Sequence, residues 1–352
     1  MDLFPLVRPF ASIVDPETAH RLTIRALRMG LGPSRHGSDP VSLGVDLFGL
    51  HFENPVGIAA GFDKNGEVPD AMLALGMGFA EVGTVTPLPQ SGNPRPRIFR
   101  LPVHRAVINR LGFNNEGHEA LKKRLLARRR RPGIVGVNIG ANKDAADRVA
   151  DYEAGIRMFD GLAAYFTVNI SSPNTPGLRA LQSRAELQGL VARVLAARRT
   201  DRARPTPVLL KIAPDLNEEE LTDIAEVALA EGLDGLIVSN TTIAREGLVS
   251  GVHAGETGGL SGAPLFAMST GVLRDMYRLT KGRIPLVGVG GIMSGDDAYA
   301  KIRAGASLVQ LYSALTYEGP ALVSRIKQGL AARLAADGFA HLKDAVGADV
   351  EL

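Results

Sequence analysis

The sequence predicts an α/β protein, one (β/α)8 barrel that carries a helical extension at its N-terminus. Short apolar runs alternate with amphipathic helical stretches from residue 56 onward, a pattern typical of a parallel sheet covered by helices. Polar side chains follow almost every run, whereas the first forty residues lack the alternation. We therefore expect an extension over residues 1–40, a barrel over 41–340 and a C-terminal tail over 341–352.

The barrel strands are expected where the sequence is apolar and rich in β-branched residues. Near-continuous apolar runs are required when the strands of a parallel sheet are buried on both faces. Helical patterns follow most of the runs, for example over residues 218–230 and 295–304. Eight runs meet this description: residues 56–61, 79–85, 134–139, 166–170, 208–212, 235–239, 285–289 and 308–311.

Two connections are longer than a normal βα unit. Residues 87–132 contain RIFRL and AVINRLGF, which we expect to form short strands over the barrel mouth. The Gly-rich residues 244–264 are expected to form a second lid. The basic run 122–131 is interpreted as a solvated helix end, because Pro132 and Gly133 follow it.

The composition excludes several classes of function. A net charge of +3, with 5% aromatic residues and no Trp, is too weak a signal for nucleic-acid binding. The chain has no Cys, which excludes disulfides, thiolate nucleophiles, iron–sulfur clusters and Cys-based zinc sites. Its seven His show no metal-binding spacing such as HExxH, so no metal is expected. Without a spanning apolar run or a signal peptide, we expect a reducing, cytosol-facing compartment.

The N-terminal extension combines an apolar segment with an amphipathic helix. Residues 3–14 are apolar and are interrupted by two prolines; Asp15 and Pro16 then form an N-cap and first turn, and Gly30 ends the helix. A helical wheel places one set of residues on an apolar face and three arginines opposite: Ala19, Leu22, Ala26, Leu27 and Met29 against Arg21, Arg25 and Arg28. Such a helix packs on its own domain or lies on an anionic membrane surface, and the pattern alone leaves both open.

Polar residues gather where the predicted strands end. The carboxyl ends of barrel strands converge on one face, where the active sites of this fold lie. A single lysine there is ordinarily a surface residue, but burying many polar groups is costly unless a ligand satisfies them. We therefore predict a polar ligand site built from Asp63, Lys64, Thr84, Asn138, Asn169, Lys211, Asn240, Thr241, Gly290, Gly291, Tyr312 and Ser313.

Two loops at this face suggest what the ligand carries. The segment GVGGIMSGDDA places glycines where the seventh strand meets a helix N-terminus, which favours a phosphate or other anion, although Gly-Gly also occurs as a plain tight turn. Neither GxGxxG nor a P-loop is present. The segment NISSPNTPGL after the fourth strand is either an ordinary turn or the source of a hydroxyl base.

Several long segments resemble one family. VGIAAGFDKNGE, EVGTVTP, NPRPRIFRL, INRLGFNN, VNISSPNTPGLR, GVGGI and LVQLYSAL are similar, in order, to signature segments of dihydroorotate dehydrogenases. The resemblance runs from about residue 43 to the end of the barrel. It implies FMN bound to the barrel and oxidation of dihydroorotate to orotate in pyrimidine synthesis.

The resemblance also implies roles for individual residues. Ser239 stands where relatives often have Thr, and it keeps the hydroxyl. Residues implied to hold the flavin are Ala60, Gly61, Phe62, Asp63, Lys64, Thr84, Asn138, Asn169, Lys211, Ser239, Gly262, Gly291, Tyr312 and Ser313. Residues implied to meet the substrate are Lys64, Asn109, Arg110, Leu111, Gly112, Phe113, Asn169, Asn174, Asn240 and Thr241.

One residue indicates the class. The soluble classes carry a Cys base in the loop after the fourth strand, whereas this chain has Ser172, as in the membrane-associated, quinone-reducing class. That class has two N-terminal helices that form a quinone tunnel, which favours the membrane interpretation of residues 1–40. The implied tunnel residues are His20, Arg21, Arg100 and Tyr312. We expect a monomeric, peripheral protein on the cytoplasmic face of a bacterial inner membrane.

In the implied mechanism, Ser172 removes a proton from dihydroorotate as the flavin accepts hydride, with Thr175 and a water as a relay. Lys64 pairs with the substrate carboxylate, the asparagines bind its amide edges, and Lys211 stabilises negative charge on the flavin.

Three other functions remain as alternatives to a dihydroorotate dehydrogenase. They are another FMN barrel such as a dihydropyrimidine dehydrogenase-like domain, a flavin-free phosphate-binding lyase or isomerase, and a non-catalytic membrane-surface module.

Overall fold

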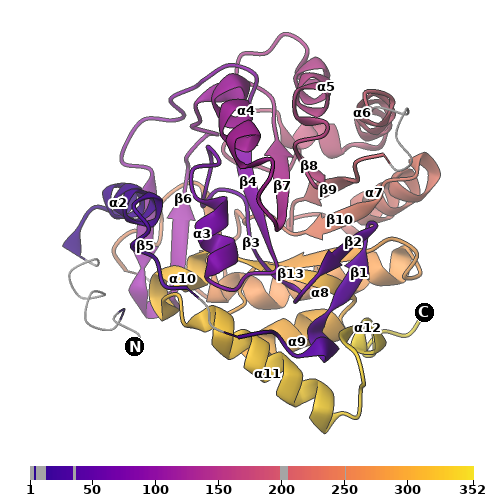
Figure 1. The fold of residues 1–352 in the computed structure, drawn as a ribbon. Coiled ribbons are helices and arrows are strands. Elements are labelled where there is room, and N and C mark those ends of the chain that lie inside the picture. Colours follow the sequence, from indigo (N-terminus) through magenta and orange to yellow (C-terminus); the bar gives the residue numbers. More distant parts are fainter. Residues whose placement is uncertain (1–3, 5–12, 35–36, 199–204, 250) are drawn as a thin grey trace.

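The predicted barrel is confirmed. The computed structural model describes residues 4, 13–34, 37–198, 205–249 and 251–352. Eight parallel strands close in the order β10-β12-β13-β3-β4-β7-β8-β9, and all eight predicted runs are among them (Figure 1). The strands are β3 (Val56–Ile58), β4 (Phe79–Val85), β7 (Ile134–Ile139), β8 (Phe166–Asn169), β9 (Val208–Ile212), β10 (Gly235–Val238), β12 (Leu286–Val289) and β13 (Ala306–Leu311).

Helices surround the barrel because each buries one apolar stripe against the strands. The predicted helices over 218–230 and 295–304 are α7 and α9; Asn217 and Glu220 form a capping box on the first, and Ser294 caps the second. The helices that follow the barrel strands are α3 (Pro69–Ala74), α4 (Gly117–Arg128), α5 (Arg148–Phe159), α6 (Arg184–Ala196), α7 (Glu218–Glu231), α8 (Phe266–Leu279), α9 (Gly295–Arg303), α10 (Ser313–Glu318) and α11 (Leu322–Ala336).

Short elements close the barrel and its loops. The hairpin of β1 (Val45–Leu47) and β2 (Leu50–Phe52) packs on the barrel through Phe52, whose ring lies 5.5 Å from that of Phe79. The described part of the chain also forms the 3-10 turns η1 (Val41–Leu43), η2 (Pro102–His104), η3 (Arg179–Gln182) and η4 (Ala263–Leu265). The basic run ends α4 as predicted, and Arg128 and Arg131 both pair with Asp70.

The two long connections form one sheet. β5 (Ile98–Leu101) and β6 (Ala106–Asn109) arise from the first connection and β11 (Gly259–Gly262) from the second, and they pair antiparallel in the order β11-β6-β5. Gly259 lies opposite Asn109, so segments far apart in the chain are held in register. The sheet has a small core of its own: Phe99, Leu101, Ala106, Ile108 and Leu260.

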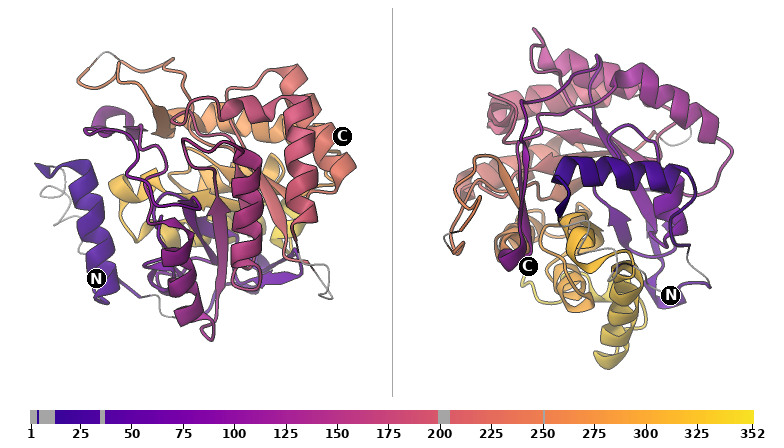
Figure 2. Two further views of the ribbon diagram at one scale, coloured as in Figure 1. Left: turned by 90° about the horizontal axis from the view of Figure 1, so that it is seen from above. Right: turned by 90° about the vertical axis from the view of Figure 1, so that its left-hand side faces the viewer.

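Helix α2 (Pro16–Arg28) begins and ends as predicted, with Asp15 accepting a hydrogen bond from the Thr18 amide. It packs against β5, beside the barrel (Figure 2). The apolar face of the helical wheel is only partly buried, because Leu22 and Met29 are 50% and 69% exposed while Glu17 and Ile24 are buried. The helical wheel could not anticipate that a buried carboxylate would orient the helix. Most of the apolar segment 3–14 lies outside the described residues.

Two further segments pack on the barrel: the connection that follows α2, and the C-terminal part of the chain. Asp39 and Lys327 of α11 form an ion pair of 2.9 Å, and each side chain is only 5% exposed. Helix α12 (Leu342–Ala345) lies in the predicted tail and buries Leu342 and Ala345.

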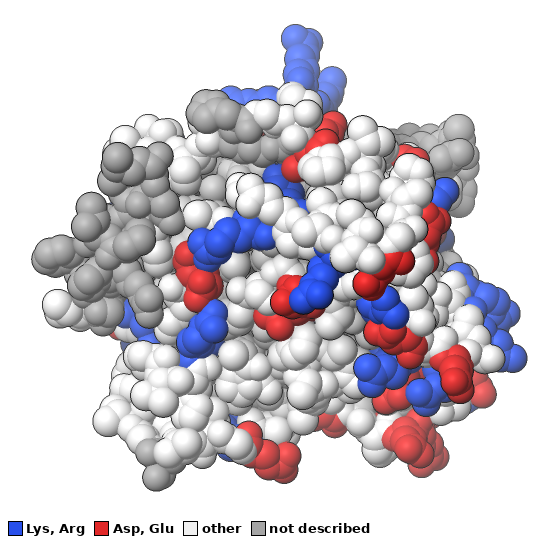
Figure 3. Space-filling model, turned by 90° about the horizontal axis from the view of Figure 1, so that it is seen from below, with Lys and Arg blue, Asp and Glu red and all other residues white. Residues whose placement is uncertain are grey.

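Charged side chains of both signs lie next to one another on the face shown in Figure 3. Within the described residues, no helix is long and apolar enough to cross a membrane.

Candidate active site

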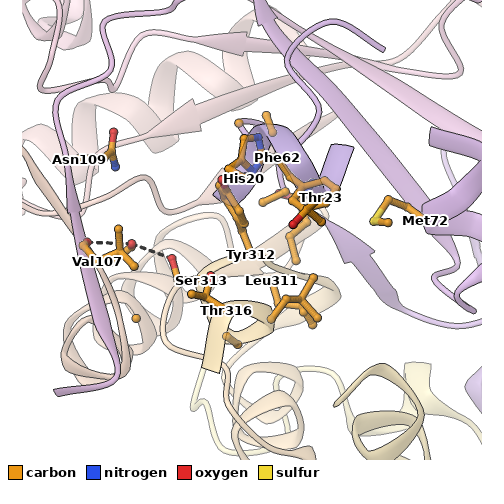
Figure 4. Close-up of a pocket in the computed structure, with 18 of the residues that line it drawn as sticks. His20, Thr23, Phe62, Met72, Val107, Asn109, Leu311, Tyr312, Ser313 and Thr316 are labelled. Carbon is orange, nitrogen blue, oxygen red and sulfur yellow. Dashed lines mark hydrogen bonds between the residues drawn. The ribbon is translucent and has the colours of Figure 1, made fainter. Parts of the chain in front are cut away.

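A cavity of about 1040 Å³ lies at the carboxyl ends of the barrel strands, bordered by the three-stranded sheet and α2 (Figure 4). Most predicted site residues line this one space, although they come from separate segments of the chain. They are His20, Ala60, Gly61, Phe62, Lys64, Thr84, Arg100, Asn109, Leu111, Gly112, Phe113, Asn169, Ser172, Asn174, Lys211, Ser239, Asn240, Thr241, Gly262, Gly291, Tyr312 and Ser313.

Some predicted residues do not line the cavity: the relay residue Thr175, and Asp63, Arg110, Arg21 and Asn138. The Asp63 carboxylate accepts hydrogen bonds from the amides of Glu67 and Val68 and so shapes the loop after β3. The Arg110 side chain pairs with Glu256 and lies 4.4 Å from the centre of the Phe99 ring. Arg21 is exposed, and Asn138 is buried beneath the cavity floor, so each could act on a ligand only indirectly.

Hydrogen-bonded side chains connect the barrel interior to the cavity. Asn138 Nδ2 donates to Glu81 (2.8 Å), and its Oδ1 accepts from Thr84 Oγ1 (2.6 Å). Thr84 accepts in turn from Asn169 Nδ2 at 2.9 Å, and Asn169 Oδ1 accepts from Asn240 Nδ2 at 3.3 Å. Each link fixes the orientation of the next amide, so the asparagines present defined donors and acceptors to a ligand.

Glu81 and Gln310 are site residues that the sequence analysis missed. Glu81 is fully buried, and its carboxylate accepts from Asn138, Tyr165 and Gln310. Gln310 lines the cavity, and its Oε1 is a buried acceptor without a hydrogen bond in the described structure. A Glu in the middle of the largely apolar run 79–85 was the available signal, because a buried charge needs several partners.

The loop after β8 is held in place over the cavity. Ser172 is 6% exposed, and its Oγ accepts a hydrogen bond from the Asn174 amide at 3.2 Å. Asn174 Nδ2 donates to Asn109 Oδ1 at 3.2 Å, which connects the loop to β6. Arg179, also missed, donates to the carbonyls of Ser171 and Thr241 and pairs with Asp215. The Oγ atom of Ser172 is therefore held in place by the loop.

Two lysines give the polar part of the cavity a positive character. Lys64 Nζ donates to the Gly61 carbonyl at 2.7 Å, and burial lowers the pKa of Lys64 to about 8. Lys211 is 6% exposed, and burial lowers the pKa of its ammonium as well. Both cations would recover stabilisation on pairing with an anionic or electron-rich ligand.

Glycines and serines form another part of the wall. Gly291 has a φ of +78°, and a Cβ there would lie 2.5 Å from the Phe266 backbone nitrogen, so only glycine fits. The Oγ atoms of Ser313 and Ser261 are 2.7 Å apart, and Ser261 Oγ also donates a hydrogen bond to the Val107 carbonyl (Figure 4). A backbone without a Cβ can approach a ligand closely, and the ends of strands seven and eight are where the sequence analysis expects an anion.

An aromatic cluster separates this polar region from an apolar one. The Phe62 ring centre lies 5.4 Å from that of His20 and 5.6 Å from that of Tyr312. Burial, with Lys64 nearby, lowers the pKa of His20 to about 3, so this imidazole is neutral at physiological pH. Beyond the cluster the cavity continues under α2, where its lining includes Ala19, Ala26, Leu27, Met72, Leu75 and Leu315.

These features define a (β/α)8-barrel enzyme in which one cavity joins a polar, amide-rich region to an apolar region under an N-terminal helix. Residues 42–334 match the family model described as dihydroorotate dehydrogenase. The chain therefore belongs to the dihydroorotate dehydrogenase family, as the sequence segments predicted.

Relatives and solved structures agree with this assignment. A protein of Parvibaculum lavamentivorans named dihydroorotate dehydrogenase (quinone) is 85% identical over the whole of both chains. One of the same name from Rhodospirillum rubrum is 59% identical over 99% of this chain and 95% of its own. The crystal structure of DHODH from Eimeria tenella in complex with ferulenol has a TM-score of 0.92 and 43% identity, covering 95% of this chain and 96% of that one. The prediction of the quinone-dependent class is confirmed.

Proposed function

We propose that the chain oxidises (S)-dihydroorotate to orotate in de novo pyrimidine (UMP) biosynthesis, with the electrons passing through FMN to a membrane quinone. The observation that carries this proposal is the continuous cavity. Its polar part contains the amides, hydroxyls and lysines that a charged pyrimidine needs, and its apolar part suits a quinone. The name shared by relatives up to 85% identical over the full length supports the same reaction.

The residues present fit FMN. Gln310 Oε1 is a buried acceptor that needs a donor, and the glycine turn accommodates a phosphate. When bound, FMN would supply the hydride acceptor and a route for single electrons. We propose that it is held by Ala60, Gly61, Phe62, Lys64, Thr84, Asn169, Lys211, Ser239, Gly262, Gly291, Tyr312 and Ser313, while Asp63 and Asn138 support this wall from behind.

The polar residues of the cavity would bind dihydroorotate by charge and by shape. Lys64 would pair with the substrate carboxylate, which raises the pKa of this lysine again and keeps it protonated. Asn109, Asn174, Asn240 and the other amides would match the donors and acceptors of the ring, since each is already oriented by a neighbour. The backbone of residues 111–113 and Thr241 would complete the enclosure.

Ser172 is the proposed base that takes the C5 proton of the substrate. A serine hydroxyl is a poor base at its ordinary pKa, so it requires activation. The Asn174 amide that donates to Ser172 Oγ would stabilise negative charge on that oxygen. Thr175 is buried in the same loop, and we propose that its hydroxyl and a water relay the proton onward.

The apolar region is proposed to admit a quinone from the membrane. His20, Arg100 and Tyr312 line it, and Arg100 Nη1 donates to the Val14 carbonyl, which connects the wall to the start of α2. Leu22 and Met29 remain exposed on α2 near Arg21, Arg25 and Arg28, a combination suited to an anionic bilayer surface. We therefore propose a peripheral protein of the cytoplasmic face of a bacterial inner membrane.

The visible spectrum of the purified chain, refilled with FMN and kept anaerobic, tests the proposal. A flavin spectrum that bleaches on addition of dihydroorotate and recovers on addition of a quinone would support both halves of it. A protein that does not retain flavin, or whose flavin is indifferent to dihydroorotate, would contradict it.

A further inference from the structure

A buried lysine outside the cavity lies directly behind the Gly290-Gly291 turn. Lys301 of α9 is fully buried, and its Nζ donates to Ser269 Oγ at 2.6 Å and lies 3.5 Å from the Val289 carbonyl. Ser269 Oγ lies 2.8 Å from the Leu265 carbonyl and 3.1 Å from the Gly290 carbonyl, within hydrogen-bonding distance of both. A single hydroxyl therefore connects the ammonium to the turn that lines the cavity.

The surroundings of Lys301 compensate little of its charge. From α8 it faces the uncharged Ser269 and the ring of Phe266, and from β12 the backbone of Val289. Among the described groups, Asp297 of α9 itself is the charged residue whose field reaches it, and burial lowers the pKa of Lys301 to about 7. An apolar side chain of similar length would fill the same space at a lower desolvation cost, so packing alone does not account for a lysine here.

We propose that Lys301 is a positioning residue for the phosphate of FMN. Its ammonium orients the Gly290-Gly291 turn through Ser269 and places a positive charge behind the backbone amides that would face the phosphate. In a low-dielectric interior such a charge acts over several ångströms, so direct contact with the ligand is unnecessary. This inference rests on the proposed function, because it takes FMN to be the ligand of the cavity.

Comparing FMN with riboflavin isolates the phosphate. Full-length protein stripped of flavin is titrated with each at pH 7, and dissociation constants are read from the quenching of flavin fluorescence. Lys301→Gln keeps a donor for Ser269 without the charge, and Lys301→Met removes both. We expect each variant to bind FMN about tenfold more weakly and riboflavin as before, with exposed Lys343→Gln as the matched control. Equal weakening of both flavins, or no weakening of FMN, would overturn the proposal.

The unaltered chain provides a second test if the variants do not fold. A bound phosphate would raise the pKa of Lys301, so FMN binding takes up a proton once the pH exceeds about 7. The ratio of FMN to riboflavin affinity should therefore fall between pH 7 and 9, by up to about tenfold per pH unit. Titration of Lys64 and Lys211 affects the binding of both flavins, so the ratio to riboflavin removes its effect. The phosphate of FMN is already largely dianionic at pH 7, so its own titration changes the ratio little. A flat ratio would overturn the role of Lys301, whereas failure to bind either flavin would overturn the proposed function itself.

Discussion

Glu17 of α2 and Arg97 of the first long connection form a bidentate ion pair, although 80 residues separate them in the chain. Arg97 Nε and Nη2 donate to the two carboxylate oxygens at 2.9 and 2.8 Å, and the side chains are only 5% and 11% exposed. The Arg97 guanidinium holds the pKa of Glu17 at about 2. The helix that borders the apolar part of the cavity is thus attached to the barrel by charge as well as by packing.

Glu17→Gln should release α2 without unfolding the barrel. The substitution leaves the buried Arg97 without its carboxylate, which costs far more than loss of an exposed pair. Amide hydrogen exchange within α2 should accelerate by at least about tenfold, while the barrel strands keep their protection. Glu67→Gln, which breaks the more exposed pair with Arg28, is the control and should change α2 exchange little. Equal acceleration in both variants would contradict the role given to Glu17.

Ser172→Ala should retain flavin and lose most dihydroorotate oxidation. Loss of a positioned base lowers the rate by at least about a hundredfold, because the remaining contacts bind the substrate but do not accept its proton. The measurement is the anaerobic rate of flavin bleaching after rapid mixing with dihydroorotate. Ser183→Ala, at an exposed helix N-cap without a side-chain capping bond, should behave as the unaltered chain. A nearly normal bleaching rate would remove Ser172 from its proposed role.

Orotate binding should weaken above pH 8. Lys64 has a pKa of about 8 in the ligand-free chain, so it is protonated below this value and progressively neutral above it. A carboxylate ligand favours the protonated form, and the dissociation constant of orotate should rise toward about tenfold per pH unit once the pH exceeds 8. Titrations that follow the flavin spectrum between pH 6.5 and 9 check this. Lys64→Met should bind more weakly at every pH and lose the dependence; a pH-independent constant in the unaltered chain would be inconsistent with pairing to Lys64.

Substitutions of Arg100 and Arg21 should differ in their effect on the KM for the quinone. Arg100 lines the cavity and Arg21 is exposed outside it, so Arg100→Met should raise the KM for a short-chain quinone by about tenfold and Arg21→Met should leave it unchanged. Bleaching by dihydroorotate should remain normal in both. Steady-state assays in detergent, with the quinone varied, measure the difference. Equal effects of the two substitutions would exclude this division of roles.

The barrel was predictable because its strands are marked locally, by apolar runs and by polar residues at their ends. Asn169, Lys211 and Asn240 lie at strand ends in the sequence and meet in one cavity, as expected for this fold. The pairing of β11 with β6 was not predictable, because the register between Gly259 and Asn109 depends on contacts across 150 residues. Local periodicity carries no information about such a partner.

Buried polar interactions explain the other differences. The wheel for α2 grouped Leu22 and Met29 on the apolar face, but both are exposed because the helix is oriented by the buried Glu17, which the wheel treats as solvent-facing. Glu81 and Gln310 escaped notice because neither follows a strand end; they lie within β4 and β13 and meet only when the barrel closes. Identifying them requires knowing which interior positions share a layer.

The ion pair between Asp39 and Lys327 determines where the chain can be shortened. A barrel fragment beginning at residue 41, the boundary expected from the sequence, would lack Asp39 and deprive a buried ammonium of its carboxylate. Breaking a buried pair in this way typically costs about 3–5 kcal/mol, a large fraction of the stability of a domain. A truncated protein that omits α2 should therefore retain Asp39 and end its deletion in the segment between Gly30 and this residue.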